Sequence, residues 1–166
     1  ATEAWDITTG SPSVVVAVCD QDGVDQPQTT SGDLANYDNT IDWDHVGADS
    51  DPWPSTPYYY QSSVYPYYYF ISFPHGTACI SIIGARTNNS TGVAGIAGGN
   101  NTTAGVTTTM HRATDTDGMQ AAILALSDPN GTDTDVISIS WGWPTPGWNS
   151  LDDAERAAVT DACNTA

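Results

Sequence analysis

His75 stands at the head of a run of small and apolar residues that extends to residue 85. This run predicts a buried helix with one titratable imidazole at its N-terminus. Asp20 directly follows a second apolar run, residues 13–19, and begins an acidic turn that ends at Asp25. An aspartate that orients a histidine, which in turn activates a nucleophile, is the arrangement of a catalytic triad. Taken separately, a single histidine is more often structural, and an Asp/Gly turn is usually no more than a turn.

Strands and helices that would position these two side chains alternate along the chain. Residues 13–19 are rich in β-branched valine and apolar on both faces, which is typical of a central strand covered on both sides. Later strands are expected at 105–113 and 135–142, and the expected helices are 75–85, 117–126 and 150–159. The alternation predicts an α/β fold, a parallel β-sheet with helices on both faces and right-handed crossovers. Asp20 would then lie at the carboxyl edge of the sheet, where α/β proteins build their sites.

Composition limits the classes of function. The chain has 166 residues, the size of one domain, and 3 Lys+Arg against 20 Asp+Glu give a net charge of −17. Such a surface repels nucleic acid and anionic lipid, so neither is expected as a partner. No apolar run approaches the roughly 20 residues of a membrane helix. A secreted protein is expected from the low lysine content and the many Asp, Ser, Thr and Asn residues, with any signal peptide already removed.

Four segments together resemble the subtilisin-like serine peptidases, the subtilases. They are the N-terminal strand with its Asp motif, the His75-Gly76-Thr77 motif with its helix, the polar loop at 88–97 and the strand at 135–142. The resemblance implies that His75 is the general base and that Asp20 holds its ring. Two residues separate Asp20 from Gly23, where the family has one, so Asp22 competes for that role. Asp20 is preferred because it directly follows the strand.

The same resemblance implies a polypeptide substrate. The backbone of Ser140, Trp141 and Gly142 would pair with the substrate as an added strand, and pockets would accept its side chains. Ser140 is not expected to be the nucleophile. Cys79, one turn after His75, is expected to pack in the interior rather than to react.

A structural calcium ion is also implied. Asp33 resembles the carboxylate ligand of the family, and the loop that follows the histidine helix would add further oxygens. These are the side chain of Asn89 and the carbonyls of Thr87, Thr91 and Val93. Calcium takes 6–8 oxygen ligands, so the chemistry is reasonable, although an Asn/Thr turn without metal is nearly as plausible.

No segment of the sequence resembles the family's oxyanion-hole strand or its Gly-Thr-Ser nucleophile motif. Residues 1–166 are therefore expected to be the N-terminal portion of a peptidase domain, which a C-terminal chain or segment completes. Catalysis by this chain alone is not expected.

Two further functions stay open. One is a non-catalytic subtilase relative that acts in extracellular binding or assembly. The other is a carbohydrate-binding module that uses the tyrosine-rich stretch around Tyr58 and Tyr67, within a segment, 26–73, too irregular to assign.

Overall fold

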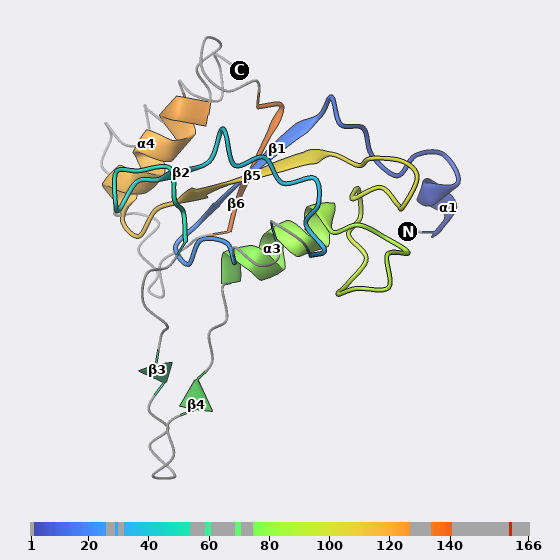
Figure 1. The fold of residues 1–166 in the computed structure, drawn as a ribbon. Coiled ribbons are helices and arrows are strands. Elements are labelled where there is room, and N and C mark those ends of the chain that lie inside the picture. The colour runs from blue at the N-terminus through green and yellow to red at the C-terminus, as the bar shows by residue number, and fades with distance from the viewer. Residues whose placement is uncertain are drawn as a thin grey trace.

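Parallel strands form the main sheet of the computed structural model, in the order β2-β5-β1-β6 (Figure 1). The strands are β1 (Val15–Asp20), β2 (Trp43–Asp44), β5 (Thr107–Arg112) and β6 (Val136–Ile139). The structure describes residues 2–25, 29, 32–53, 59–60, 69–70, 75–126, 134–140 and 160. The three strands expected from the sequence are present, and β2 is an addition from the segment that could not be assigned.

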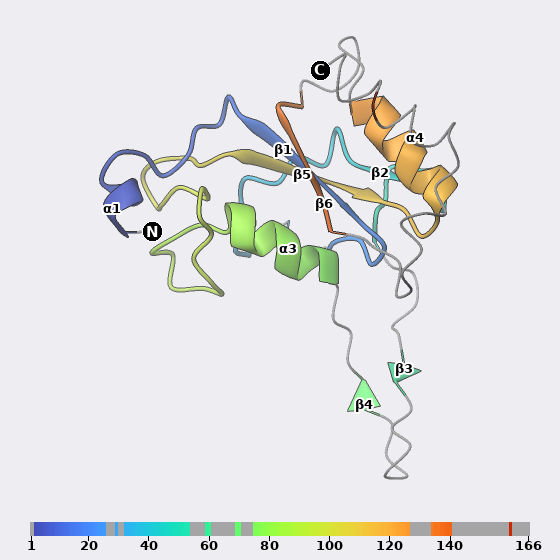
Figure 2. The same ribbon diagram turned by 180° about the vertical axis from the view of Figure 1, so that it is seen from behind.

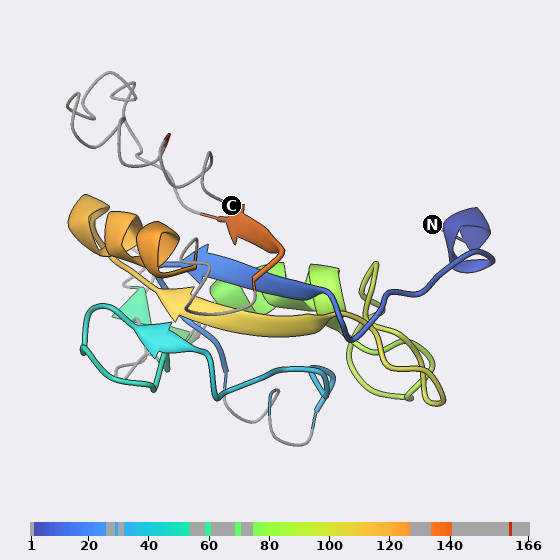
Figure 3. The same cartoon turned by 90° about the horizontal axis from the view of Figure 1, so that it is seen from above.

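The central strand β1 packs a helix on each face. Alternate side chains of a strand point to opposite sides of the sheet. Val18 packs in one cluster with Ile80 of α3 (His75–Gly84), whereas Ala17 and Cys19 pack with α4 (Thr116–Leu126). Figures 2 and 3 show the two helices on either side of the strands. The predicted α/β fold, with a parallel sheet and helices on both faces, is confirmed.

Helix α3 approaches the sheet closely because glycines stand at both of its contact points. A Cβ atom at Gly76 would lie 2.3 Å from the carbonyl oxygen of Gly23, and one at Gly84 would lie 2.5 Å from Cγ2 of Thr108. Both distances are far below ordinary van der Waals contact. The small residues of the predicted helix therefore set the distance between α3 and the sheet, and with it the position of His75.

The remaining elements are small. Helix α1 (Thr2–Trp5) is held by the Trp5 indole, which donates a hydrogen bond to the carbonyl of Ile96 at 2.8 Å. Strands β3 (Tyr59–Tyr60) and β4 (Tyr69–Phe70) form a separate antiparallel pair in the tyrosine-rich stretch (Figure 1). The helix expected at 150–159 lies outside the described residues. Within the described part of the chain, no helix has both the length and the apolar character needed to cross a membrane.

Candidate active site

Asp20 and His75 meet where strand β1 ends and helix α3 begins. Nδ1 of His75 lies 2.6 Å from Oδ2 of Asp20. Asp20 lies two residues after Val18, so its side chain points to the face that α3 covers. The Asp20 side chain is fully buried, whereas 56% of the His75 side chain is exposed. The imidazole therefore has one nitrogen fixed by the protein, while the ring remains accessible from solvent.

Backbone contacts hold the turn that follows Asp20. The N–H of Asp22 donates to Oδ1 of Asp20 at 2.8 Å, so the second carboxylate oxygen is also hydrogen-bonded. The N–H of Asp25 donates to the Thr77 hydroxyl at 2.7 Å, which ties the turn to the first turn of α3. Of the two aspartates that the sequence left open, the structure pairs Asp20 with His75. Asp22 supports Asp20 through its backbone.

Burial is the main influence on the ionisation of Asp20. It raises the pKa of the carboxyl group above its usual value, while the Asp22 N–H and the His75 ring act in the opposite direction. An ionised Asp20 accepts the Nδ1–H of His75, and this leaves the lone pair of Nε2 as the basic site. A neutral imidazole in this tautomer is ready to take a proton from a hydroxyl group.

Two cysteines lie near this arrangement and differ in their environments. Sγ of Cys79 lies 3.8 Å from Nδ1 and 4.0 Å from Nε2 of His75. Cys79 is half-buried rather than fully buried, and it completes, with Asp20 and His75, a trio of potential metal ligands within 4.8 Å of one another. Cys19 is fully buried on the opposite face, and burial raises the pKa of its thiol to about 12. Cys19 is therefore an inert core residue.

Asp33 is the centre of the predicted calcium loop. Its carboxylate is buried and accepts Nδ2–H of Asn89 at 2.7 Å and the backbone N–H of Val93 at 2.5 Å. Thr91 donates its N–H to Oδ1 of Asn89 at 3.2 Å, and Thr87 is anchored through its N–H and hydroxyl to the Gly99 carbonyl. The predicted residues thus gather around one carboxylate, and in this arrangement N–H groups contact both of its oxygens.

The loop over Asp33 requires a glycine. Gly92 has a φ of +53°, and a Cβ atom there would lie against Oδ2 of Asp33. A side chain at this position would be strained and would also displace the carboxylate.

Ser140 follows β6 and extends its pairing with the central strand. Its N–H donates to the Cys19 carbonyl at 3.0 Å. Strand β6 is the end strand of the sheet in the described part of the chain, and Val136 and Ile139 are about half exposed on it. Trp141 and Gly142 lie outside the described residues.

A comparison with protein-family models decides the family. Residues 11–165 match the model of the subtilase family. The chain belongs to the subtilases. This family consists of serine peptidases, so the general class of function is peptide-bond hydrolysis. The resemblance found in the four sequence segments is confirmed. No curated protein matches the chain.

Two features of this subtilase had no signal in the sequence. His45 and His111, 66 positions apart, share a hydrogen bond of 3.1 Å between Nε2 and Nδ1. Tyr37 and Asp42 share another, of 2.7 Å between Oη and Oδ2. Tyr37, Asp42 and His45 lie in the segment before residue 53, and His111 contacts it through His45. In that segment, apolar residues do not recur every two or every 3.6 positions, so no strand or helix is predicted. Asp42 lies in such an irregular stretch, so its burial and its contact with Tyr37 can be recognised only from the tertiary structure.

Proposed function

We propose that this chain supplies the general base, His75, and its orienting carboxylate, Asp20, to a serine endopeptidase. The observation that carries the proposal is the 2.6 Å contact between a fully buried carboxylate and an exposed imidazole. A buried acid behind an accessible histidine gives the ring one orientation and one tautomer. Membership of the subtilase family supports the reaction class.

Each proton in the proposed reaction has a defined place. Nε2 of His75 takes the proton of a serine hydroxyl as its oxygen attacks the peptide carbonyl. The imidazolium that forms keeps its Nδ1–H on Oδ2 of Asp20, whose negative charge stabilises it. Nε2 then gives its proton to the departing amine, and the neutral ring returns for deacylation by water.

The serine itself is proposed to come from a polypeptide segment outside residues 1–166. The sequence contains no Gly-Thr-Ser motif, which supports this view. The exposed face of α3 begins with His75 and continues through Ala78 to Ile82, which is 60% exposed. A segment that packs on this face would bring a side chain next to Nε2. Backbone of Ser140, Trp141 and Gly142 is proposed to bind the substrate as an added strand beside β6, through groups other than the Ser140 N–H, which donates to the Cys19 carbonyl.

We also propose that a structural calcium ion binds at Asp33. The Asn89 amide can turn about its last torsion, which would replace its N–H by its oxygen beside Asp33 Oδ1. Asp33 Oδ1, the Asn89 side chain and the carbonyls of Thr87, Thr91 and Val93 would then supply oxygen ligands, which suits Ca²⁺, while Asp33 Oδ2 keeps its hydrogen bond from the Val93 N–H. The ion would fix the loop that follows α3. Its proposed role is structural. Secretion is supported by the acidic, lysine-free composition.

The test compares two isosteric variants of the full-length protein. Asp20→Asn is expected to reduce kcat for a peptide amide by roughly 10⁴-fold, since the amide favours the wrong imidazole tautomer. Asp22→Asn is the matched control because it keeps the backbone N–H that contacts Asp20, and its kcat should stay within about twofold of the unaltered protein. Thermal unfolding shows whether both variants fold.

The reverse ranking of these variants would assign the orienting role to Asp22. Full activity of His75→Ala would refute the proposed base. A folded, full-length protein that neither cleaves peptides nor reacts with a fluorophosphonate probe would be a non-catalytic binding relative.

A further inference from the structure

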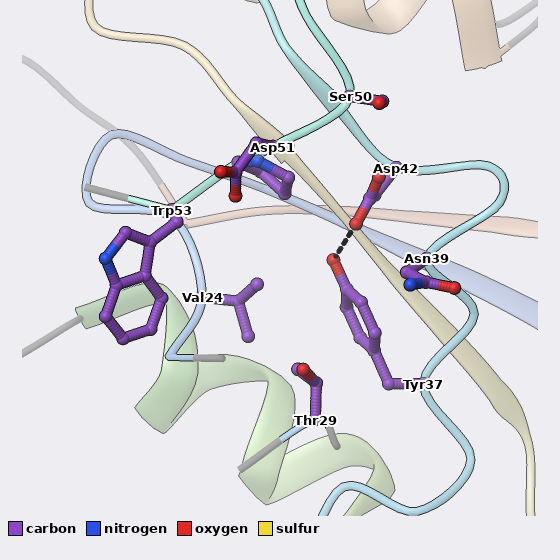
Figure 4. Close-up of a pocket in the computed structure, with 9 residues that line it drawn as sticks. Val24, Thr29, Tyr37, Asn39, Asp42, Ser50, Asp51 and Trp53 are labelled. Atoms are coloured by element: carbon purple, nitrogen blue, oxygen red, sulfur yellow. Dashed lines mark hydrogen bonds between the residues drawn. The ribbon is translucent and has the colours of Figure 1, made fainter. Parts of the chain in front are cut away.

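A cavity of about 280 Å³ lies beside the active-site turn, between that turn and the segment around strand β2 (Figure 4). Its walls include Val24, Tyr37, Asp42, Asp51 and Trp53. Figure 4 shows the Trp53 and Tyr37 rings on opposite sides, with Val24 between them and the two aspartates above. Nothing in the proposed peptidase reaction uses this cavity.

Asp42 carries the clearest sign of a missing partner. It is only 6% exposed, and Oδ2 accepts a hydrogen bond from the Tyr37 hydroxyl at 2.7 Å. Oδ1 is buried and has no hydrogen-bond partner among the residues that the structure describes. Buried polar atoms of native proteins are nearly always hydrogen-bonded, because removing such an atom from water without a new partner costs free energy.

The charges around Asp42 have one sign. Burial, with smaller contributions from the nearby Asp51 and Asp38, raises the pKa of its carboxyl group to about 6, although the hydrogen bond from the Tyr37 hydroxyl acts in the opposite direction. The chain has no lysine, and neither Arg86 nor Arg112 lines the cavity.

The two arginines in the described part of the chain are engaged elsewhere. Arg112 pairs with Asp44 at 2.9 Å, and Arg86 donates to Asn36. No described cation of the chain therefore compensates Asp42 above pH 6.

The residues that line the cavity indicate which kind of cation it would bind. Two carboxylates and two aromatic rings favour a cation with an apolar part, because such a group can lie on an aromatic face while its N–H groups meet the carboxylates. A bare metal ion fits less well. Among the described residues, only Asp20, His75 and Cys79 bring three His, Cys or acidic ligand atoms within 4.8 Å of one another.

We propose that this cavity binds an organic cation, an ammonium or guanidinium group on a short apolar stem. Asp42 and Asp51 supply the charge, and the faces of Trp53 and Tyr37 hold the stem. The source is either a free small molecule or a basic side chain of a polypeptide. The proposal does not depend on the peptidase reaction, so its failure would leave that proposal standing.

Calorimetric titration of the full-length protein at pH 7.5 tests the proposal with two probes of the same shape. n-Butylguanidinium is expected to bind at least tenfold more tightly than uncharged n-butylurea. Asp42→Asn should weaken the guanidinium probe at least tenfold and leave the urea unchanged. Asp6→Asn, which removes one exposed charge near the N-terminus, is the matched control and should keep the affinity within about twofold.

A third probe, acetyl-Gly-Arg-Gly-amide, distinguishes the sources. Equal or tighter binding of this peptide assigns the cavity to a polypeptide side chain, and binding of the free cation alone assigns it to a small molecule. Trp53→Phe should retain affinity and Trp53→Ala should lose it. Equal affinities for the guanidinium and urea probes, no binding of either, or an unaltered affinity in folded Asp42→Asn would overturn the proposal.

Discussion

Substitution of Gly76 by alanine should separate the two partners of the candidate active site without changing either of them. The new Cβ would lie 2.3 Å from the Gly23 carbonyl oxygen, about 1 Å closer than the 3.4 Å at which ordinary contact begins. It would also lie 2.9 Å from Cε of Met110 and 3.1 Å from Cβ of Asp20. Because the closest neighbour is backbone, it cannot turn away, and the start of α3 must move by about that amount.

The expected cost has two parts. Forcing an extra methyl group into a well-packed contact destabilises a domain by roughly 1–3 kcal/mol. A displacement of about 1 Å between catalytic groups lowers the rate by roughly 10²-fold. The full-length Gly76→Ala protein should therefore unfold at a lower temperature and hydrolyse peptide amides about a hundredfold more slowly.

Gly118→Ala is the matched control, since it makes the same change in the other helix. Its Cβ would meet Oδ1 of Asp115 at 3.0 Å and Cβ of Ala113 at 3.4 Å, so only a side chain has to adjust. Stability is expected to stay within about 1 kcal/mol of the unaltered protein, since alanine also favours the helix. A Gly76→Ala protein as stable and active as Gly118→Ala would refute the view that this close contact positions His75.

Three further outcomes follow from the buried acids and histidines. Chelation with EGTA should lower the unfolding temperature of the full-length protein, and Asp33→Asn should abolish that difference, as measured by calorimetry; equal sensitivity in both proteins would contradict the calcium proposal. His111 is 2% exposed and is held between His45 and the Ile41 carbonyl, and burial lowers the pKa of its ring to about 4. As the pH falls, His111 therefore takes up a proton in the unfolded chain before it does so in the folded protein. Up to roughly 3 kcal/mol of the free energy of unfolding should be lost as the pH falls from 6.5 through 4. His111→Gln should remove that loss when the free energy of unfolding is measured with urea over this pH range. The pH dependence expected from Asp42 has the opposite sign, because its raised pKa makes the folded state less stable as the pH rises from 3.8 through 6. Asp42→Asn should therefore unfold at an equal or higher urea concentration at pH 7. A clearly lower urea concentration would show that the charged carboxylate is already compensated in the folded protein.

The helices and strands that carry the site were largely predictable from local pattern. A strand that is apolar on both faces buries its side chains only when other elements cover both faces of the sheet. Strand β1 indeed lies between α3 and α4. The run of small and apolar residues predicted the buried histidine helix, and its Gly76 and Gly84 allow the close approach to the sheet. Strand β2 was missed because two residues are too few to show a period.

The sequence by itself determined the order of the elements, the family motifs and the expectation that an aspartate at the end of a strand orients His75. Those properties follow from residue type and from spacing along the chain. The choice of Asp20 over Asp22 was decided by tertiary structure, because only the packing of α3 shows which side chain faces the ring. Only the tertiary structure shows that Oδ1 of Asp42 is buried without a hydrogen-bond partner among the described residues. Burial and unmet hydrogen bonds depend on segments distant in sequence, and no local pattern records them.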